Sequence, residues 1–167
     1  MITLTQKQAG FFALSGTLDE SLKTSDVSST ILAGCAGLTT LHLDLFGIRG
    51  GNSSGLLHFI NLLRSVPLAL NISRVPVWMV WQFNMLYDLL SQHLWISSFE
   101  AEYTNPATQV GRTFLLEVEH DIPLRDDYSD FKAPQKQHEG EVFVPDFDET
   151  YLDFMVFLNS VRRDRKG

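Results

Sequence analysis

The chain has 167 residues, of which 44% are hydrophobic and 20% are charged. This length suffices for one globular domain with a sizeable core, or for a small domain with an extension. Twenty acidic against thirteen basic residues give a net charge of −7, which argues against a nucleic-acid partner because binding phosphates needs a basic face. The single cysteine, Cys35, excludes an internal disulfide framework and a cysteine-based zinc site.

The N-terminal residues contain no long apolar stretch of the kind found in targeting segments. The most apolar segment, residues 66–90, is interrupted by prolines, amides and charged side chains, whereas a membrane span needs about 20 nearly uninterrupted apolar residues. His120 and His138 lack the paired spacing of zinc ligands. We therefore expect a cytoplasmic protein without membrane insertion, metal or cofactor.

Hydrophobic periodicity predicts an α/β domain over residues 1–100. Strands are predicted at 2–5, 10–16, 40–46, 68–73 and 95–99, and helices at 20–33, 53–65 and 77–91. The resulting order, β-β-α-β-α-β-α-β, requires crossover connections and hence a largely parallel, mixed sheet with the opening hairpin at one side. In the last helix we expect a buried apolar stripe, formed by Val77, Val80, Trp81, Met85 and Leu89.

Residues 101–167 differ from this domain in pattern and in charge. Strands are predicted at 112–118 and 141–144, and a helix at 151–163. The polar stretch between the strands, 121–140, offers no apolar face to bury, and residues 117–153 hold twelve acids against three bases. We predict a C-terminal β-ribbon of two strands and a helix, packed on the first domain as an extension. A ribbon that crossed to a second chain would instead make a homodimer.

The most informative segment runs from Leu43 to Leu57, where a strand is expected to end at Phe46 and a glycine-rich turn to follow. Asn52 or Ser53 then caps a helix, because a short side-chain oxygen can accept an unpaired backbone N–H. A serine at this position lies beside the free N–H groups and the positive end of the helix dipole. A phosphate on Ser53 would therefore be tolerated and could be recognised by a partner.

The same segment leaves a second interpretation open. Gly51-Asn52-Ser53-Ser54-Gly55 also satisfies G-x-S-x-G, the nucleophile elbow of serine hydrolases, and its strand–turn–helix context suits one. Such an enzyme needs a histidine and an acid after the serine, and the available histidines are His58, His93, His120 and His138. No second glycine-rich loop offers an oxyanion hole. We expect no enzymatic activity and keep the small serine hydrolase as an alternative.

Two short motifs occur in the order and spacing of a known family. Asn52-Ser53-Ser54-Gly55-Leu56 opens the second predicted helix, after a strand ending in Asp44-Leu45-Phe46, and Gly16-Thr17-Leu18-Asp19 follows the second predicted strand. Together they resemble the Asp-Ser-Ser/Thr-Gly-Leu signature and the Gly-x-Leu-Asp turn of STAS domains, the fold of bacterial anti-sigma factor antagonists. The resemblance covers residues 1–100 and implies a STAS-like domain.

This resemblance implies a regulatory protein-interaction domain. In the family, an anti-sigma factor serine kinase phosphorylates the first serine of the signature, and the phosphoserine breaks their complex; the matching residue here is Ser53. The partner-binding surface that the resemblance implies consists of Asp19, Asp44, Asn52, Ser53, Ser54 and Gly55. Asn52 stands where the family carries an aspartate. Other STAS domains act as docking modules without a switch or brace a transport assembly, and both roles remain alternatives.

Overall fold

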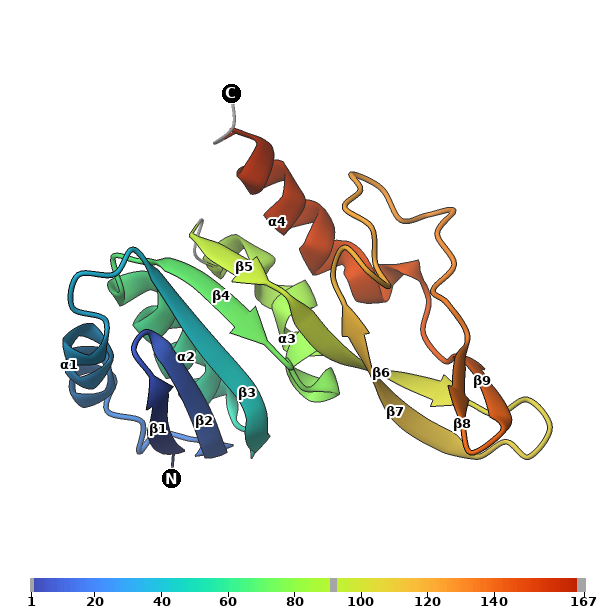
Figure 1. Cartoon of the computed structure of the whole chain (residues 1–167), viewed down its shortest axis with the longest axis horizontal. Coiled ribbons are helices and arrows are strands. Elements are labelled where there is room, and N and C mark those ends of the chain that lie inside the picture. Colours follow the sequence, from blue (N-terminus) through green and yellow to red (C-terminus); the bar gives the residue numbers. More distant parts are fainter. Residues whose placement is uncertain (1, 91–92, 165–167) are drawn as a thin grey trace.

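The computed structural model describes residues 2–90 and 93–164, which form a mixed α/β protein with two sheets (Figure 1). The first sheet contains β1 (Ile2–Gln8), β2 (Phe11–Leu18), β3 (Thr40–Gly51), β4 (Ala69–Ser73) and β5 (Leu94–Ile96). The second contains β6 (Ser98–Thr104), β7 (Gly111–Glu117), β8 (Lys136–His138) and β9 (Glu141–Pro145). The helices are α1 (Thr24–Gly34), α2 (Ser53–Ser65), α3 (Val77–Leu86) and α4 (Asp153–Asp164), with short 3₁₀ turns η1 (Tyr87–Leu89) and η2 (Glu149–Leu152).

The first sheet has the strand order β1-β2-β3-β4-β5. β1 and β2 form an antiparallel hairpin, whereas β2, β3, β4 and β5 are parallel neighbours. One helix connects each parallel pair, and right-handed crossovers in one direction place α1, α2 and α3 on the same face (Figure 1). The α/β class and the mixed sheet with an opening hairpin, both predicted from the sequence, are confirmed.

The core of this half lies between the sheet and its helices. Strand residues that point toward the helices are fully buried, among them Phe12, Leu14, Leu41, Leu45 and Ile72, and they share one core cluster with buried residues of α1 and α2. Ser15, Thr17 and His42, on the opposite face, are exposed. The strands therefore alternate between an apolar and a polar face, as half-buried strands do.

β3 is longer than the sequence predicts. The glycine-rich turn expected after Phe46 is wrong, because the strand continues and pairs with β2 up to Gly51, with two shifts of register. A Cβ atom on Gly47 would lie 2.5 Å from the Cβ of Ser15, and one on Gly51 would lie 2.8 Å from the carbonyl oxygen of Leu18. These glycines allow two backbones to approach closely at an irregular pairing, and they do not form a turn.

α3 buries a different stripe from the predicted one. Its buried residues are Met79, Val80 and Phe83, whereas Trp81 and Met85 are 43% and 66% exposed. Because apolar residues occupy most of the circumference of this helix, spacing alone cannot select its buried face, and the contacts with β6 and α4 select it instead. The predicted end of the helix, at residue 91, lies outside the described residues. No helix in the described ranges has both the length and the apolar character of a membrane span.

The second sheet corrects the predicted two-stranded ribbon. Its strand order is β7-β6-β9-β8, and all neighbours are antiparallel. β7 and β9, the two strands that periodicity predicts, do not pair with each other, because β6 lies between them. β6 follows β5 after the single residue Ser97 and so carries the chain from one sheet to the other. Its last residues and all of β8 are not predicted by the sequence pattern.

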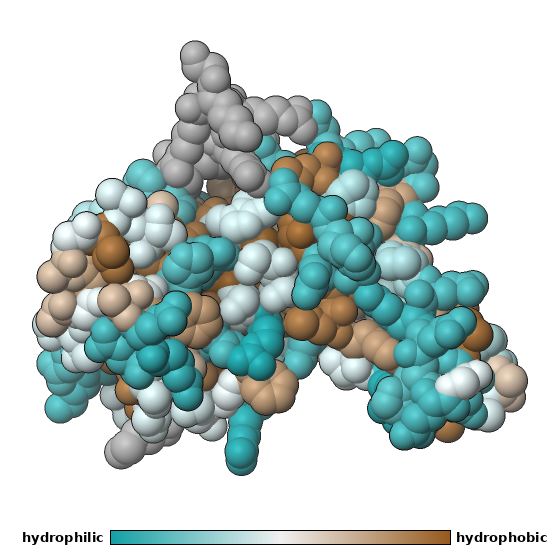
Figure 2. All heavy atoms as spheres, in the orientation of Figure 1, coloured by the Kyte–Doolittle hydropathy of each residue, from teal (hydrophilic) through white to brown (hydrophobic). Residues whose placement is uncertain are grey.

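The acidic segment 121–140 also departs from the prediction that it has nothing to bury. Ile122 is fully buried and Tyr128 is 3% exposed. The Tyr128 hydroxyl donates to the carbonyl of Pro123 at 2.7 Å and accepts a hydrogen bond from Nδ2 of Asn159, on α4, at 3.2 Å. The buried residues are too irregularly spaced to produce a periodic signal. Hydrophilic side chains predominate over this half of the molecule in the space-filling view (Figure 2).

Residues from η2 and α4 join the two sheets into one core. Tyr151 is 1% exposed, its hydroxyl donates to the carbonyl of Glu100 at 2.6 Å, and its ring meets that of Trp81 edge-on at 5.0 Å between centroids. The amide of Asn84, on α3, donates to the carbonyl of Tyr151 at 3.1 Å and accepts the N–H of Phe154 at 2.8 Å. The start of α4 is therefore attached to α3 by both apolar and polar contacts.

Candidate functional site

The residues of the predicted signature lie where β3 ends and α2 begins. Asn52 is the N-cap of α2, and its Oδ1 accepts the backbone N–H of Gly55 at 2.8 Å. The backbone N–H of Asn52 donates to the carbonyl of Leu18, at the end of β2, at 2.9 Å. The N-terminus of α2 is thus fixed by the side chain and the backbone of one residue.

The turn that follows β2 contributes two acids to this site. Asp19 accepts hydrogen bonds from the hydroxyl and, at 2.9 Å, the N–H of Ser21, and the hydroxyl bond is the main cause that lowers the pKa of Asp19 to about 2. Oε2 of Glu20 accepts a hydrogen bond from Nδ2 of Asn52 at 2.9 Å, which lowers the pKa of Glu20. Both acids are therefore ionised at neutral pH. The oxygen of the Asn52 amide thus caps α2, and its nitrogen donates to Glu20 in the turn after β2.

Gly55 permits the close contact between this turn and α2. It is buried, and a Cβ atom there would lie 2.2 Å from the carbonyl carbon of Leu18 and 2.3 Å from the nitrogen of Asp19. No larger residue fits without displacing the backbone. Gly50, only five positions earlier, has no atom within 4 Å of an added Cβ. Position 55 therefore requires glycine, whereas position 50 does not.

Ser53 and Ser54 are the first two residues of α2, and both are exposed. They lie beside the unpaired N–H groups and the positive end of the helix dipole. Leu57, on the next turn of the same helix, is 51% exposed, and residues three or four apart are neighbours on a helix. One continuous surface results, which we name the α2 surface; it consists of Asp19, Glu20, Asn52, Ser53, Ser54 and Leu57.

Asp44, also predicted for this surface, is directed elsewhere. Its side chain is 7% exposed, and its carboxylate forms a two-pronged ion pair with Arg74, one bond of which, from Nε to Oδ1, measures 2.8 Å. This hydrogen bonding raises the pKa of Arg74. The guanidinium also lies over the ring of Phe46, 4.5 Å from its centroid. The structure brings together the other predicted residues but joins Asp44 to the end of β4.

The geometry around Ser53 differs from that of an activated serine. A nucleophile elbow holds its serine on a strained turn, whereas Ser53 is the first residue of a regular helix. Non-glycine residues of the described chain with positive φ are Arg74, Gln109, Glu119 and Glu139. Within residues 2–90 and 93–164, no hydrogen bond joins Ser53 to a histidine. Ser53 is therefore an exposed residue at a helix end, and no histidine of the described residues is hydrogen-bonded to it.

Two members of the α2 surface are absent from the sequence prediction. Glu20 contacts Asn52 across thirty-two positions of the chain, and no local pattern indicates that pairing. Leu57 carries a usable signal, because Leu56, Phe59, Ile60 and Leu63 already define the apolar face of the helix and Leu57 lies off it. An exposed leucine beside the signature serines could therefore have been found from helical spacing alone.

No protein-family model matches the chain, and no curated protein matches it. The interpretation of the α2 surface rests on its contacts and on the two motifs that carry the resemblance described above.

Proposed function

We propose that this chain is a non-enzymatic regulatory domain of the STAS type that docks a protein partner through the α2 surface. The observation that carries the proposal is the position of Ser53. This residue is exposed at the start of α2, and Asn52 and Gly55 hold that helix end against the turn after β2. Recognition benefits from side chains held on rigid elements. The partner that fits the resemblance is an anti-sigma factor serine kinase, with Ser53 as the phosphorylated residue.

Phosphorylation of Ser53 would change the charge of this surface without unfolding it. A phosphate adds a charge of about −1.5 to −2 at neutral pH. The N-terminus of α2 accommodates an anion, so the helix remains formed. Asp19 and Glu20 already make the neighbouring turn negative. A partner complementary to the unmodified hydroxyl therefore meets added bulk and concentrated negative charge, and the complex dissociates.

The phosphorylation step is tested with wild-type protein and the variants Ser53→Ala and Ser54→Ala. Each is incubated with extract of the native host and radiolabelled ATP, and the labelled site is located by mass spectrometry. We expect label on the wild type and on Ser54→Ala but not on Ser53→Ala; Ser54 is the matched control because it is the adjacent exposed serine. If only Ser54 is labelled, or if extracts from all growth conditions leave the protein unlabelled, phosphorylation of Ser53 is contradicted. The proposed function is then a docking module without a phosphorylation switch.

The docking step is tested by a photo-reactive residue placed at position 57, with the same residue at position 85 as control. Leu57 lies on the α2 surface, whereas Met85 is 66% exposed on α3. We expect a cross-linked partner at position 57 that Ser53→Asp abolishes, and none at position 85. Equal cross-linking at the two positions would contradict docking at the α2 surface. If the captured partner is a membrane protein, the result would favour the alternative in which the domain braces a transport assembly.

The competing hydrolase makes opposite predictions for the same residue. It requires that Ser53 react with a fluorophosphonate probe and that Ser53→Ala abolish ester hydrolysis. The docking function requires neither. Labelling of the wild type that Ser53→Ala prevents would replace our proposal with the enzyme.

A further inference from the structure

A groove of about 610 Å³ opens in the second half of the chain. Residues 129–135 form one wall, and the end of β9 together with η2 forms the other. No residue of the α2 surface lines it. The groove is therefore a separate feature that the proposed docking function leaves without a role.

The groove exists because a β-hairpin opens. β8 and β9 pair over three residue pairs, the last of which is Lys136 opposite Phe143. β9 continues through Val144 and Pro145, where it pairs with β6 on its other side. Residues 129–135 diverge from β9 at this point and leave a slot between the two stretches of chain. Such a slot beside a strand suits an extended segment, as in other complexes where a peptide lies along a sheet.

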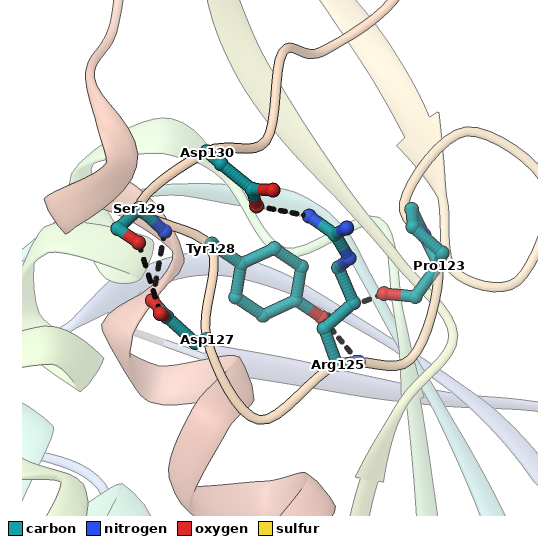
Figure 3. A network of polar contacts seen from close by, with 6 residues as sticks. All are labelled: Pro123, Arg125, Asp127, Tyr128, Ser129 and Asp130. Atoms are coloured by element: carbon teal, nitrogen blue, oxygen red, sulfur yellow. Dashed lines mark hydrogen bonds and ion pairs between the residues drawn. The ribbon is translucent and has the colours of Figure 1, made fainter.

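The wall formed by residues 129–131 is held in place by the polar network in Figure 3. Nη1 of Arg125 donates to Asp130 at 2.7 Å, and the hydroxyl of Tyr128 donates to the carbonyl of Pro123 at 2.7 Å. The charge of Asp130 is therefore already paired with a cation. A wall that is fixed before binding loses little conformational entropy when a ligand enters.

Two aromatic side chains line the groove, one from each wall. The ring of Phe131 packs edge-on against that of Tyr128 at 5.6 Å between centroids, and the ring of Phe147 lies 4.9 Å from that of Tyr151. Both are only partly buried. Aromatic faces in a fixed position attract apolar side chains and the cationic groups of lysine and arginine.

The charged residues of the groove leave an excess of negative charge. Asp148 and Glu149 line it at the start of η2, and Lys132 is the only cation among the described lining residues. No lysine or arginine of the described chain forms an ion pair with either acid. The carboxylate of Asp148 caps η2 by accepting hydrogen bonds from the N–H of Thr150, at 3.0 Å, and from its hydroxyl, and it keeps its negative charge.

We propose that this groove binds an extended basic segment of a partner protein. A lysine or arginine side chain of that segment lies between Phe131 and Phe147, with its charge toward Asp148 and Glu149, and the adjoining apolar residues contact Val144, Pro145 and Leu152. The complementarity of charge selects a basic segment over an acidic one. The aromatic side chains of the two walls provide the contact area. The stretch 129–135 makes the groove long enough for an extended segment.

The experiment measures fluorescence anisotropy of a labelled nine-residue peptide in which lysine and arginine alternate with leucine and valine. The full chain is titrated against this peptide, against a matched peptide with glutamate and aspartate as its charged residues, and against a peptide with the chain's own basic sequence, residues 161–167. We expect micromolar binding of the first peptide that weakens with salt, and no binding of the acidic one. Equal binding of the acidic peptide overturns the proposal.

Variants then locate the binding site. Glu149→Gln should weaken binding about threefold and Phe131→Ala about tenfold. Glu141→Gln, an exposed acid on β9 outside the groove, removes the same charge and should leave binding unchanged, as should Ser53→Ala. If Glu149→Gln and Glu141→Gln behave alike, the groove is not the site. Tighter binding of the 161–167 peptide than of the designed one would make a second copy the occupant and overturn a separate partner.

Discussion

The two sheets of this protein are assembled from strands at different separations along the chain. In the first sheet, each parallel strand pairs with the strand that follows it, and one helix makes each connection. In the second, β6 pairs with the adjacent β7 but also with β9, where Thr104 lies opposite Val144, forty residues later. Residues 1–116 are nearly neutral, with seven acids and six bases, whereas residues 117–153 carry twelve acids and three bases.

This difference implies that the two halves acquire their cores in different ways. The first sheet buries its apolar face against helices that the same segment supplies. The second sheet and α4 depend on α3, through the contacts of Tyr151 and Phe154 with Trp81 and Asn84. Small segments rarely bury enough apolar surface to fold alone, so the second half relies on the first.

A chain that ends at Glu102 is the strongest test of whether the reverse dependence also holds. It lacks Tyr151 and Phe154, and losing a buried aromatic side chain costs about 3–5 kcal/mol. The sum is comparable with the whole stability of a domain, about 5–15 kcal/mol. We expect the shortened chain to unfold or aggregate, as measured by circular dichroism and size-exclusion chromatography. A soluble monomer with the unfolding temperature of the full chain would show that the first sheet is autonomous.

A second, smaller effect is expected at the junction of β2 and α2. Gly55→Ala should lower the free energy of unfolding by about 3 kcal/mol, because the added methyl group overlaps the backbone of the preceding turn. Gly50→Ala is the matched control, since its methyl group meets no atom within 4 Å, and it should change stability by less than about 0.5 kcal/mol. Urea denaturation measures both. Similar losses in the two variants would refute the close packing at position 55.

The same contrast explains which parts of the fold could be predicted from the sequence. Leu41, Leu43 and Leu45 alternate along β3, and Leu56, Phe59 and Ile60 recur at helical spacing in α2, so that local patterns suffice for the first half. The continuation of β3 through its glycines is missed, because their role depends on contacts with β2. In the second half, β6 becomes a central strand only through its pairing with β9, which no local pattern contains.

The candidate site shows the same limit. A helix cap at Asn52 or Ser53 follows from residue type and position, and the structure places it at Asn52. The partner of Asp44 was not predictable, because its ion pair with Arg74 spans thirty positions. Glu20 was missed for the same reason. Sequence patterns thus locate the helix end, whereas the charges around it depend on which distant residues the fold brings together.

An ion pair in the acidic half should make stability depend on pH. Asp121 has a side chain only 8% exposed, and it accepts hydrogen bonds from Nζ of Lys136 at 2.7 Å and from the N–H of Glu117 at 2.9 Å. Burial alone would raise its pKa, but these hydrogen bonds lower it below the ordinary 3.8. The pKa of Asp121 is therefore lower in the folded than in the unfolded protein. Its contribution to stability is complete above the unfolded pKa, 3.8, and is lost as the pH falls through the folded pKa.

Asp121→Asn should therefore reduce the free energy of unfolding by about 1 kcal/mol at neutral pH. The difference in free energy of unfolding between variant and wild type should disappear in acid, where the wild-type carboxylate is protonated. Glu141→Gln, which removes an exposed acid of the same half, should show no such difference. Urea denaturation at a series of pH values provides the measurement. A difference that persists after Asp121 is protonated would assign the effect to packing and not to charge.

An effect of similar or smaller size concerns the two ends of the Asn52 amide, which join the turn after β2 to the start of α2. Asn52→Ala removes the helix cap and should cost about 1 kcal/mol. Asn52→Asp keeps a cap oxygen but replaces the donor to Glu20 with a second carboxylate, so its loss should be smaller and should decrease with salt. The pKa of Glu20, now lowered by Nδ2 of Asn52, should rise in both variants, and more in Asn52→Asp because of the added charge. Carboxyl-detected NMR titration measures this shift. An unchanged Glu20 pKa in Asn52→Asp would show that Asn52 does not connect the turn to the helix end. The rigid arrangement on which docking at Ser53 depends would then be contradicted.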